Sequence, residues 1–283
     1  MPKPELKDKI AEWLNTQGYP LEMKVAAALR KKGFEVIQSF YYEDENEGKL
    51  REIDVVASKH LLNCIIYFVI ECKKSSKNHW ILFSSGDIID QFDANSMFCY
   101  MSEGARSLLY DYDIDGVELE SIPWHNKNGR IAYSAADFNK DKNANGATYK
   151  AIMSVSNASQ FIEYINIKDT INPVNSRPKQ KECFIFPVII FEGKLFECFL
   201  QNNTTELEEI YEAFYFHSPQ LKYKSGTYIR ILSADRLEKF CEEADQIYNK
   251  LYSIMGQHKV NRVKGVLKYL EEDGQLSNNE EVE

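Results

Sequence analysis

The 283-residue chain lacks the long apolar stretch that a membrane span requires. Its longest strongly apolar run, residues 64–70, is far shorter than the roughly 20 residues that cross a bilayer. The first residues, Met-Pro-Lys-Pro-Glu, contain no apolar signal segment. A hydrophobic content of 44% is nonetheless ample for a buried core. We therefore expect a soluble, cytoplasmic protein with no membrane partner.

Motifs built on cysteine, glycine or histidine are also scarce. The six cysteines include no Cys-x-x-Cys pair and no tight cluster with histidine, which argues against structural zinc and against a disulfide framework. No glycine-rich phosphate loop occurs, which argues against ATP hydrolysis. His79, His125 and His217 each lack a spaced partner, so packing or hydrogen bonding is the simpler role for them.

Basic charge is in deficit, with 34 Lys and Arg against 43 Asp and Glu and a net charge of −9. This balance argues mildly against a protein that coats nucleic acid non-specifically. It does not exclude a nuclease, because a metal site lined by carboxylates is itself acidic. Residues 272–283 add to the negative total, and we expect them to form an acidic disordered tail. Residues 1–270 would then form a single domain, with residues 104–181 as a possible insertion.

The first hundred residues predict two helices followed by three strands. The helices cover residues 6–15 and the segment from Pro20 to Gly33, where proline suits a first turn and glycine a C-terminal cap. Strands at residues 34–42 and 52–57 flank a polar turn and form an antiparallel hairpin. The strand at residues 64–73 is apolar until its last residues, as expected for a central strand.

The rest of the chain predicts further helices and strands on both sides of a linker at residues 168–181. A single sheet built from both halves is as plausible as two domains. The expected helices are residues 86–101, 147–165, 234–255 and 259–271, and the expected strands are a hairpin of residues 183–191 and 195–200 and a strand at 227–232.

A Glu-x-Lys pattern stands out by its position. It occurs five times, starting at Glu5, Glu22, Glu47, Glu71 and Glu192. Only the copy Glu71-Cys72-Lys73 closes a long apolar strand and follows a strand that carries an acid, Asp54. Strand alternation places Glu71 and Lys73 on one face, and Asp54 on the neighbouring strand can lie beside Glu71.

Two converging carboxylates favour a bound cation, because like charges repel each other unless a cation lies between them. Oxygen ligands of this kind suit Mg²⁺, with Mn²⁺ as a substitute. Such an ion activates water and stabilises charge on a phosphate, and a nearby lysine can orient or deprotonate the water or stabilise that charge. The alternative is that Asp54 is a turn acid and that Glu71 forms a strand-end salt bridge with Lys73.

The order helix, strand, strand, strand, helix over residues 20–101, with these acids and this lysine, resembles the core of the PD-(D/E)XK nuclease superfamily. The resemblance implies an α/β fold with a restriction-endonuclease-like mixed β-sheet flanked by helices, and additional strands and helices from the C-terminal half. It implies Asp54, Glu71 and the backbone carbonyl of Cys72 as metal ligands and Lys73 as the catalytic lysine. The sequence departs from the motif in having Ile53 before Asp54, where many members have proline.

The resemblance also implies that Glu22, on the second helix, acts on the metal through a water molecule. A first-turn acid favoured by the helix dipole is the alternative. Lys74, Ser75 and Lys77 follow the motif and are candidates for holding the DNA backbone, with an exposed polar loop as the alternative. Glu52 is a weak candidate for an additional ligand.

Aromatic residues such as Trp80 and Phe83 could stack on unpaired bases. Core packing accounts for most of them, since the aromatic content is 13%.

The function implied by this resemblance is a divalent-metal-dependent endonuclease that cleaves DNA. Residues 186–197 and 225–228 are similar to later strands of bacterial restriction-like nucleases of phage defence, which suggests the nuclease of a defence or restriction system. The low basic charge suggests that a homodimer or a multiprotein complex supplies the DNA-binding surface. Two alternatives stay open: a non-catalytic nuclease-like subunit for DNA binding or complex assembly, and an RNA-cleaving toxin with the same site.

Overall fold

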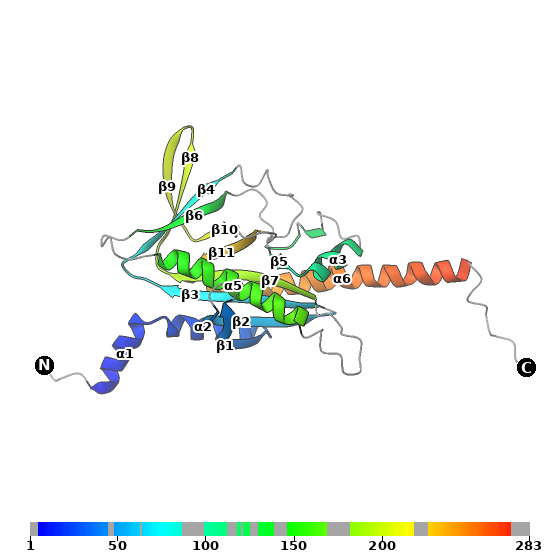
Figure 1. Ribbon diagram of the computed structural model, residues 1–283, viewed down its shortest axis with the longest axis horizontal. Coiled ribbons are helices and arrows are strands. Elements are labelled where there is room, and N and C mark those ends of the chain that lie inside the picture. Colours follow the sequence, from blue (N-terminus) through cyan, green and yellow to red (C-terminus); the bar gives the residue numbers. More distant parts are fainter. Residues whose placement is uncertain are drawn as a thin grey trace, which may run out of the picture.

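In the computed structural model, the described residues are 5–44, 48–62, 64–86, 99–111, 118–119, 121–124, 130–138, 146–168, 182–217 and 226–272. They form one mixed sheet with helices on both faces (Figure 1). The strands are β1 (Glu35–Asp44), β2 (Lys49–Leu61), β3 (Cys64–Lys74), β4 (His79–Ser85), β5 (Tyr100–Met101), β6 (Ile131–Phe138), β7 (Glu182–Glu192), β8 (Leu195–Gln201), β9 (Thr204–Ile210), β10 (Glu212–His217) and β11 (Thr227–Ser233). The helices are α1 (Leu6–Thr16), α2 (Tyr19–Lys31), α3 (Glu103–Asp111), α5 (Ala147–Lys168), the 3₁₀ turn η2 (Ala234–Arg236) and α6 (Leu237–Glu272).

The two N-terminal helices confirm the sequence prediction. Pro20 lies in the first turn of α2, and Gly33 follows its end with a φ of +79°, a value that glycine adopts without strain. Leu21, Val25 and Leu29 on α2 are buried in the core. No side chain of α1 is buried, and the helix projects away from the sheet (Figure 1).

Strand β3 is central, as its composition predicts. It pairs antiparallel with β2 on one side and parallel with β7 on the other, and β2 pairs antiparallel with β1. The predicted first hairpin is therefore confirmed, with strands longer than expected. Because β3 and β7 come from opposite sides of the expected linker, the two halves of the chain share one sheet.

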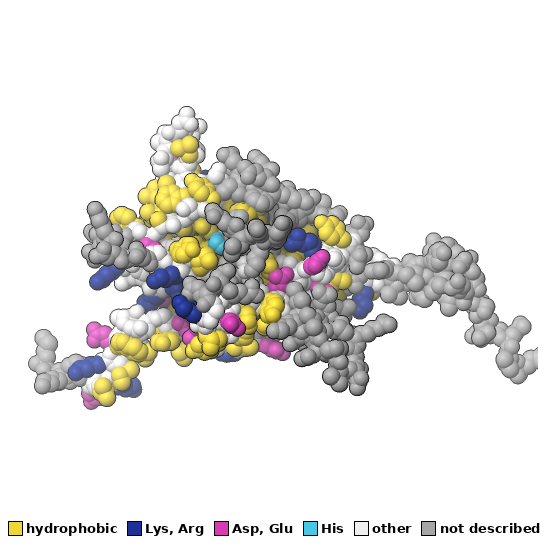
Figure 2. Space-filling view, viewed as in Figure 1, with side chains coloured by type: hydrophobic (Ala, Val, Ile, Leu, Met, Phe, Trp, Pro, Cys, Tyr) yellow, Lys and Arg dark blue, Asp and Glu magenta, His cyan; other side chains and the backbone are white. Residues whose placement is uncertain are grey.

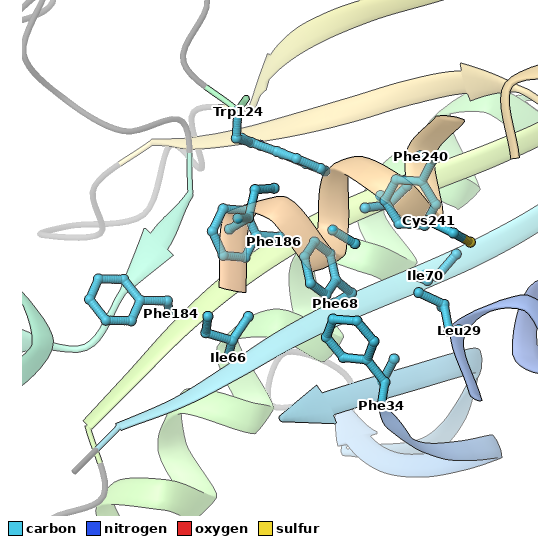
Figure 3. Packing of buried hydrophobic residues seen from close by; sticks show 14 of the residues in the cluster. Leu29, Phe34, Ile66, Phe68, Ile70, Trp124, Phe184, Phe186, Phe240 and Cys241 are labelled. Carbon is cyan, nitrogen blue, oxygen red and sulfur yellow. The ribbon is translucent and has the colours of Figure 1, made fainter. Parts of the chain in front are cut away.

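Each face of the sheet packs against its own helices. On one face, Phe68 of β3 stacks on Phe186 of β7 at 5.0 Å and meets Phe240 of α6 edge-on at 5.8 Å (Figure 3). On the other face, α5 buries Ile152 and Val155 against the sheet. The mixed α/β class is thus confirmed, and the fold confines the end of β3 between helices.

The predicted hairpin of residues 183–191 and 195–200 is wrong. Strand β7 pairs with β3, β11 and β5, whereas β8 pairs parallel with β4 and antiparallel with β9. The turn at Gly193 does not fold β8 back on β7. Instead, the β7–β8 segment runs alongside the β3–β4 segment, and the two turns are joined by hydrogen bonds from Ser75 N to Glu192 O and from Trp80 N to Lys194 O, both 3.0 Å.

Two predicted helix boundaries are also wrong. In the segment 86–101, Tyr100 and Met101 form strand β5, and residues 87–98 lie outside the described part of the chain. The helices expected at 234–255 and 259–271 are one helix, α6, which passes through Gly256 without a break. A glycine inside a helix costs only about 1 kcal/mol, and the packed residues before it hold the helix.

The helix predicted at 147–165 and the strand predicted at 227–232 are confirmed by α5 and β11. Most of the expected linker, residues 169–181, and the expected tail from residue 273 onward lie outside the described residues. Within the described ranges, no helix combines the length and the apolar character needed to cross a bilayer.

Candidate active site

Asp54 lies at the place where β2 separates from β3. The last regular pair is Val55 with Ile70, and one further step of that register brings Asp54 opposite Glu71. There the hydrogen bond between the two strands is made by a side chain, because Asp54 Oδ2 accepts a hydrogen bond of 2.6 Å from the backbone N–H of Cys72. This bond fixes the carboxylate against the end of β3.

Strand alternation is broken at Asp54. Val55 and Ala57 face the core that contains α2 and α6, but Ile53 belongs to the core on the α5 face. Residues two apart in a regular strand share a face, so the strand must twist between Ile53 and Val55. The β1–β2 register passes from Gln38–Val55 to Phe40–Ile53 without a pair at Ser39, and Ser39 has a φ of +54°, which marks the same irregularity in β1. This local twist determines the direction of the Asp54 side chain, and the twist could not be predicted from the sequence pattern.

Glu71 is buried, with 5% of its surface exposed, and both of its carboxylate oxygens have partners. Lys73 Nζ donates to Oε1, which confirms that the two side chains share a face. Ser154 Oγ donates to Oε2 at 3.0 Å. Ser154 lies on α5, and its side chain is a member of the site that the sequence analysis missed.

The charges of Asp54, Glu71 and Lys73 act on one another. The pKa of Glu71 is raised to about 7, chiefly by burial and then by the negative charge of Asp54, against the opposing effect of Lys73. Burial likewise raises the pKa of Asp54, while Lys73 and the Cys72 N–H lower it. Burial lowers the pKa of Lys73, but the nearby carboxylates outweigh this effect and the net change is upward. The structure therefore brings these three groups into one electrostatic cluster.

Glu22 approaches the cluster from α2. It is half-buried, and its pKa is raised to about 7 by burial and then by the charges of Asp54 and Glu52, with Lys73 lowering it. Glu52 is exposed, and the Tyr41 hydroxyl is hydrogen-bonded to it, which raises the pKa of Tyr41. The two acids thus border the cluster, and neither belongs to its buried centre.

A pocket of about 700 Å³ opens beside Glu71 and Lys73. Its walls come from the β1–β2 hairpin and from α5. Arg51 and Asn157 hold Asp44 in this wall through bonds of 2.7 Å and 3.1 Å to Oδ2. The lining residues are Asp44, Leu50, Arg51, Glu52, Glu71, Lys73, Ala147, Tyr149, Lys150, Met153, Ser154 and Asn157.

The nucleic-acid candidates after the motif lie outside this pocket lining. Lys74 Nζ is paired with Glu192 Oε1 at 2.5 Å, and Ser75 Oγ accepts the Asn78 N–H at 2.8 Å. Lys77 is exposed. Figure 2 shows basic and acidic side chains side by side near the end of the molecule from which α1 projects, and its coloured surface carries no extended patch of one sign.

The aromatic and histidine candidates that the structure describes lie in strands of the sheet. Trp80 is 1% exposed and stacks on Phe191 at 4.2 Å, so it cannot stack on a base, and Phe83 is partly buried. His217 is half-buried in β10, where burial lowers its pKa. His79 is half-buried in β4, and His125 lies outside the described residues.

Asp54 and Glu71 supply oxygen atoms of the kind that a divalent cation prefers. Within the described ranges, no three His, Cys, Asp or Glu side chains come together as a complete metal-binding group. Burial raises the pKa of the Cys72 thiol well above its usual range, which favours the protonated thiol in the metal-free protein. Two adjacent carboxylates that oppose each other's ionisation nonetheless fit a hard cation, which would complete its coordination with a backbone carbonyl and water.

No protein-family model, curated protein or solved structure matches this chain. The strand order and the helix layers define the mixed α/β class of the fold.

Proposed function

We propose that this protein is a divalent-metal-dependent endonuclease that hydrolyses the phosphodiester bonds of DNA. The observation that carries the proposal is the buried Glu71, which is ion-paired with Lys73 and electrostatically opposed to Asp54 at the end of a central strand. A structural salt bridge needs one acid and one base. The second, half-buried acid raises the free energy of the cluster, and a bound cation would remove that cost.

Asp54, Glu71 and the carbonyl of Cys72 are the groups that would hold Mg²⁺ or Mn²⁺. When bound, such an ion supplies Lewis-acid stabilisation of a phosphoryl oxygen. Lys73 keeps its proton, because its pKa is raised, and its ammonium group is suited to stabilising charge on the scissile phosphate. Glu22, with a pKa of about 7, is suited to taking a proton from the attacking water near neutral pH.

The test is incubation of the purified protein with plasmid DNA and with RNA, in Mg²⁺, in Mn²⁺ and in EDTA. The variants Asp54→Asn, Glu71→Gln and Lys73→Ala should each lower the cleavage rate by about a hundredfold or more, since each removes a charge at the reacting centre. Asparagine can still accept the Cys72 N–H, so the Asp54 variant keeps the local fold.

Glu192→Gln is the matched control. Glu192 also lies at a strand end and is also paired with a lysine, Lys74, but it stands outside the cluster. Its substitution should leave cleavage within about twofold. Cleavage that survives all three site substitutions would overturn the assignment. Equal inactivity of wild type and variants would favour the non-catalytic subunit, and cleavage of RNA alone would favour the toxin.

We further propose that the nuclease serves a bacterial defence or restriction system and that it binds DNA as a homodimer or together with partner subunits. The net charge of −9 motivates this step, because a single chain with few basic groups binds a polyanion weakly. Light scattering of the purified protein, alone and with DNA, measures whether two copies assemble. A monomer that binds DNA tightly at physiological salt would contradict it.

A further inference from the structure

The pocket beside Glu71 is electrically balanced in a chain that is otherwise strongly acidic. Three acidic side chains, Asp44, Glu52 and Glu71, and three basic ones, Arg51, Lys73 and Lys150, line it. Two of the acids are already neutralised, Asp44 by Arg51 and Glu71 by Lys73. A phosphate therefore meets less repulsion here than over a surface with the average charge of the chain.

Lys150 is the basic residue of this pocket that remains available. It is exposed on α5, and within the described ranges no acidic side chain forms an ion pair with it. Lys150, Ser154 and Asn157 follow one face of the helix. Because Ser154 bonds to Glu71, Lys150 lies one helical turn from the residue that holds the cleavage centre.

Tyr149 adds an aromatic surface to the same pocket. It lines the pocket with 63% of its surface exposed, so the ring is not part of the core. An exposed ring and an exposed ammonium group that line one pocket suit an unpaired nucleotide, because its base can stack on the ring and its phosphate can bind the cation. In a duplex the bases are stacked within the helix and do not reach such a ring.

We propose that this pocket is a nucleotide subsite beside the cleavage centre, in which Lys150 binds a phosphate and Tyr149 stacks on an unpaired base, so that single-stranded nucleic acid binds in preference to a duplex. The pocket volume of about 700 Å³ fits this role, since sites for small ligands span roughly 300–1,000 Å³. The inference deepens the proposed nuclease function and rests on it.

The test measures binding without cleavage. Fluorescence anisotropy in EDTA is recorded with labelled single-stranded DNA, single-stranded RNA of the same sequence and duplex DNA of the same length. Tyr149→Ala should weaken single-strand binding about five- to hundredfold, and Tyr149→Phe should restore most of it. Lys150→Ala should weaken binding and reduce the slope of log affinity against log salt by about 0.7.

Matched controls lie on helices of the opposite sheet face. Tyr110 on α3 is 80% exposed, and Lys250 on α6 is exposed. Their alanine variants should bind single strands as the wild type does. Duplex that binds as tightly as single strands, or pocket variants that match these controls, would overturn the subsite. Comparing the affinities for single-stranded DNA and single-stranded RNA shows whether the sugar contributes to binding.

The two proposals fail separately. If cleavage depends on Asp54, Glu71 and Lys73 but binding ignores Tyr149 and Lys150, the nuclease stands and the subsite is refuted. If binding depends on Tyr149 and Lys150 while no metal supports cleavage, the subsite stands and the catalytic assignment is refuted.

Discussion

Replacing Glu71 with glutamine should change how the stability of the metal-free protein depends on pH. The carboxylate has an ordinary pKa of 4.5 in the unfolded chain and a pKa of about 7 in the folded protein. Below pH 4.5 it is protonated in both states. Between these values the folded state keeps a proton that the unfolded state releases, so the free energy of unfolding falls as pH rises.

The magnitude follows from the same two pKa values. Ionising Glu71 in the folded protein costs about 3 kcal/mol relative to the unfolded chain, and with 5% of its surface exposed solvent screens little of this cost. Above pH 7 the whole cost is present. The difference in unfolding free energy between wild type and Glu71→Gln should therefore shift by about 3 kcal/mol, in favour of the variant, from pH 4 to pH 8.

Urea unfolding in EDTA at a series of pH values measures this shift. Glu22→Gln is the companion variant, because Glu22 also has a pKa of about 7 but is more exposed, and its shift should have the same sign and a smaller size. Excess Mg²⁺ at pH 8 should stabilise the wild type and leave Glu71→Gln unchanged. A wild-type-to-variant difference that stays constant with pH would refute the electrostatic reasoning.

Three further substitutions test parts of the structure. Ser154→Ala removes the 3.0 Å hydrogen bond that lowers the pKa of Glu71, so the midpoint of the pH–rate profile should move upward. The kcat should fall several-fold with little change in KM. An unchanged midpoint would contradict this role of Ser154. Gly193→Ala places a Cβ 2.4 Å from the Phe191 ring, so calorimetry should show destabilisation by about 1–3 kcal/mol. Phe68→Ala empties the aromatic centre of one core, and urea unfolding should show a loss of about 3–5 kcal/mol; a loss below about 1 kcal/mol would contradict that packing.

The first three strands could be predicted because their signals are local. The apolar run before Glu71 ends in two ionisable groups, and that pattern is typical of a central strand that ends at an active site. The pairing of β7 and β8 could not be predicted this way. Glu192-Gly193-Lys194 resembles a hairpin turn, yet its carbonyls accept hydrogen bonds from the β3–β4 turn, which lies more than 100 residues earlier in the chain. Partner choice between strands is a non-local property.

In the candidate site, too, local features could be predicted from the sequence and non-local ones could not. Glu71 and Lys73 could be placed on one face from alternation alone, but the direction of Asp54 depends on a twist that Ser39 marks with its positive φ. Ser154 could not be found at all. It lies 83 residues from Glu71, and one serine on a helix gives no signal of its role.

The net negative charge of the chain and the cost of ionising Asp54 and Glu71 side by side both point to a bound cation. A protein with a net charge of −9 repels a polyanion, and the two carboxylates Asp54 and Glu71, compensated by the single ammonium group of Lys73, leave a net negative charge where a scissile phosphate would lie. Protonating Glu71 below pH 7 would relieve the repulsion but would also remove a carboxylate of the proposed metal site. The proposed divalent cation would relieve it while both carboxylates stay ionised. Metal affinity, stability at high pH and affinity for nucleic acid should therefore rise together in the wild type, and this coupling should disappear in Glu71→Gln.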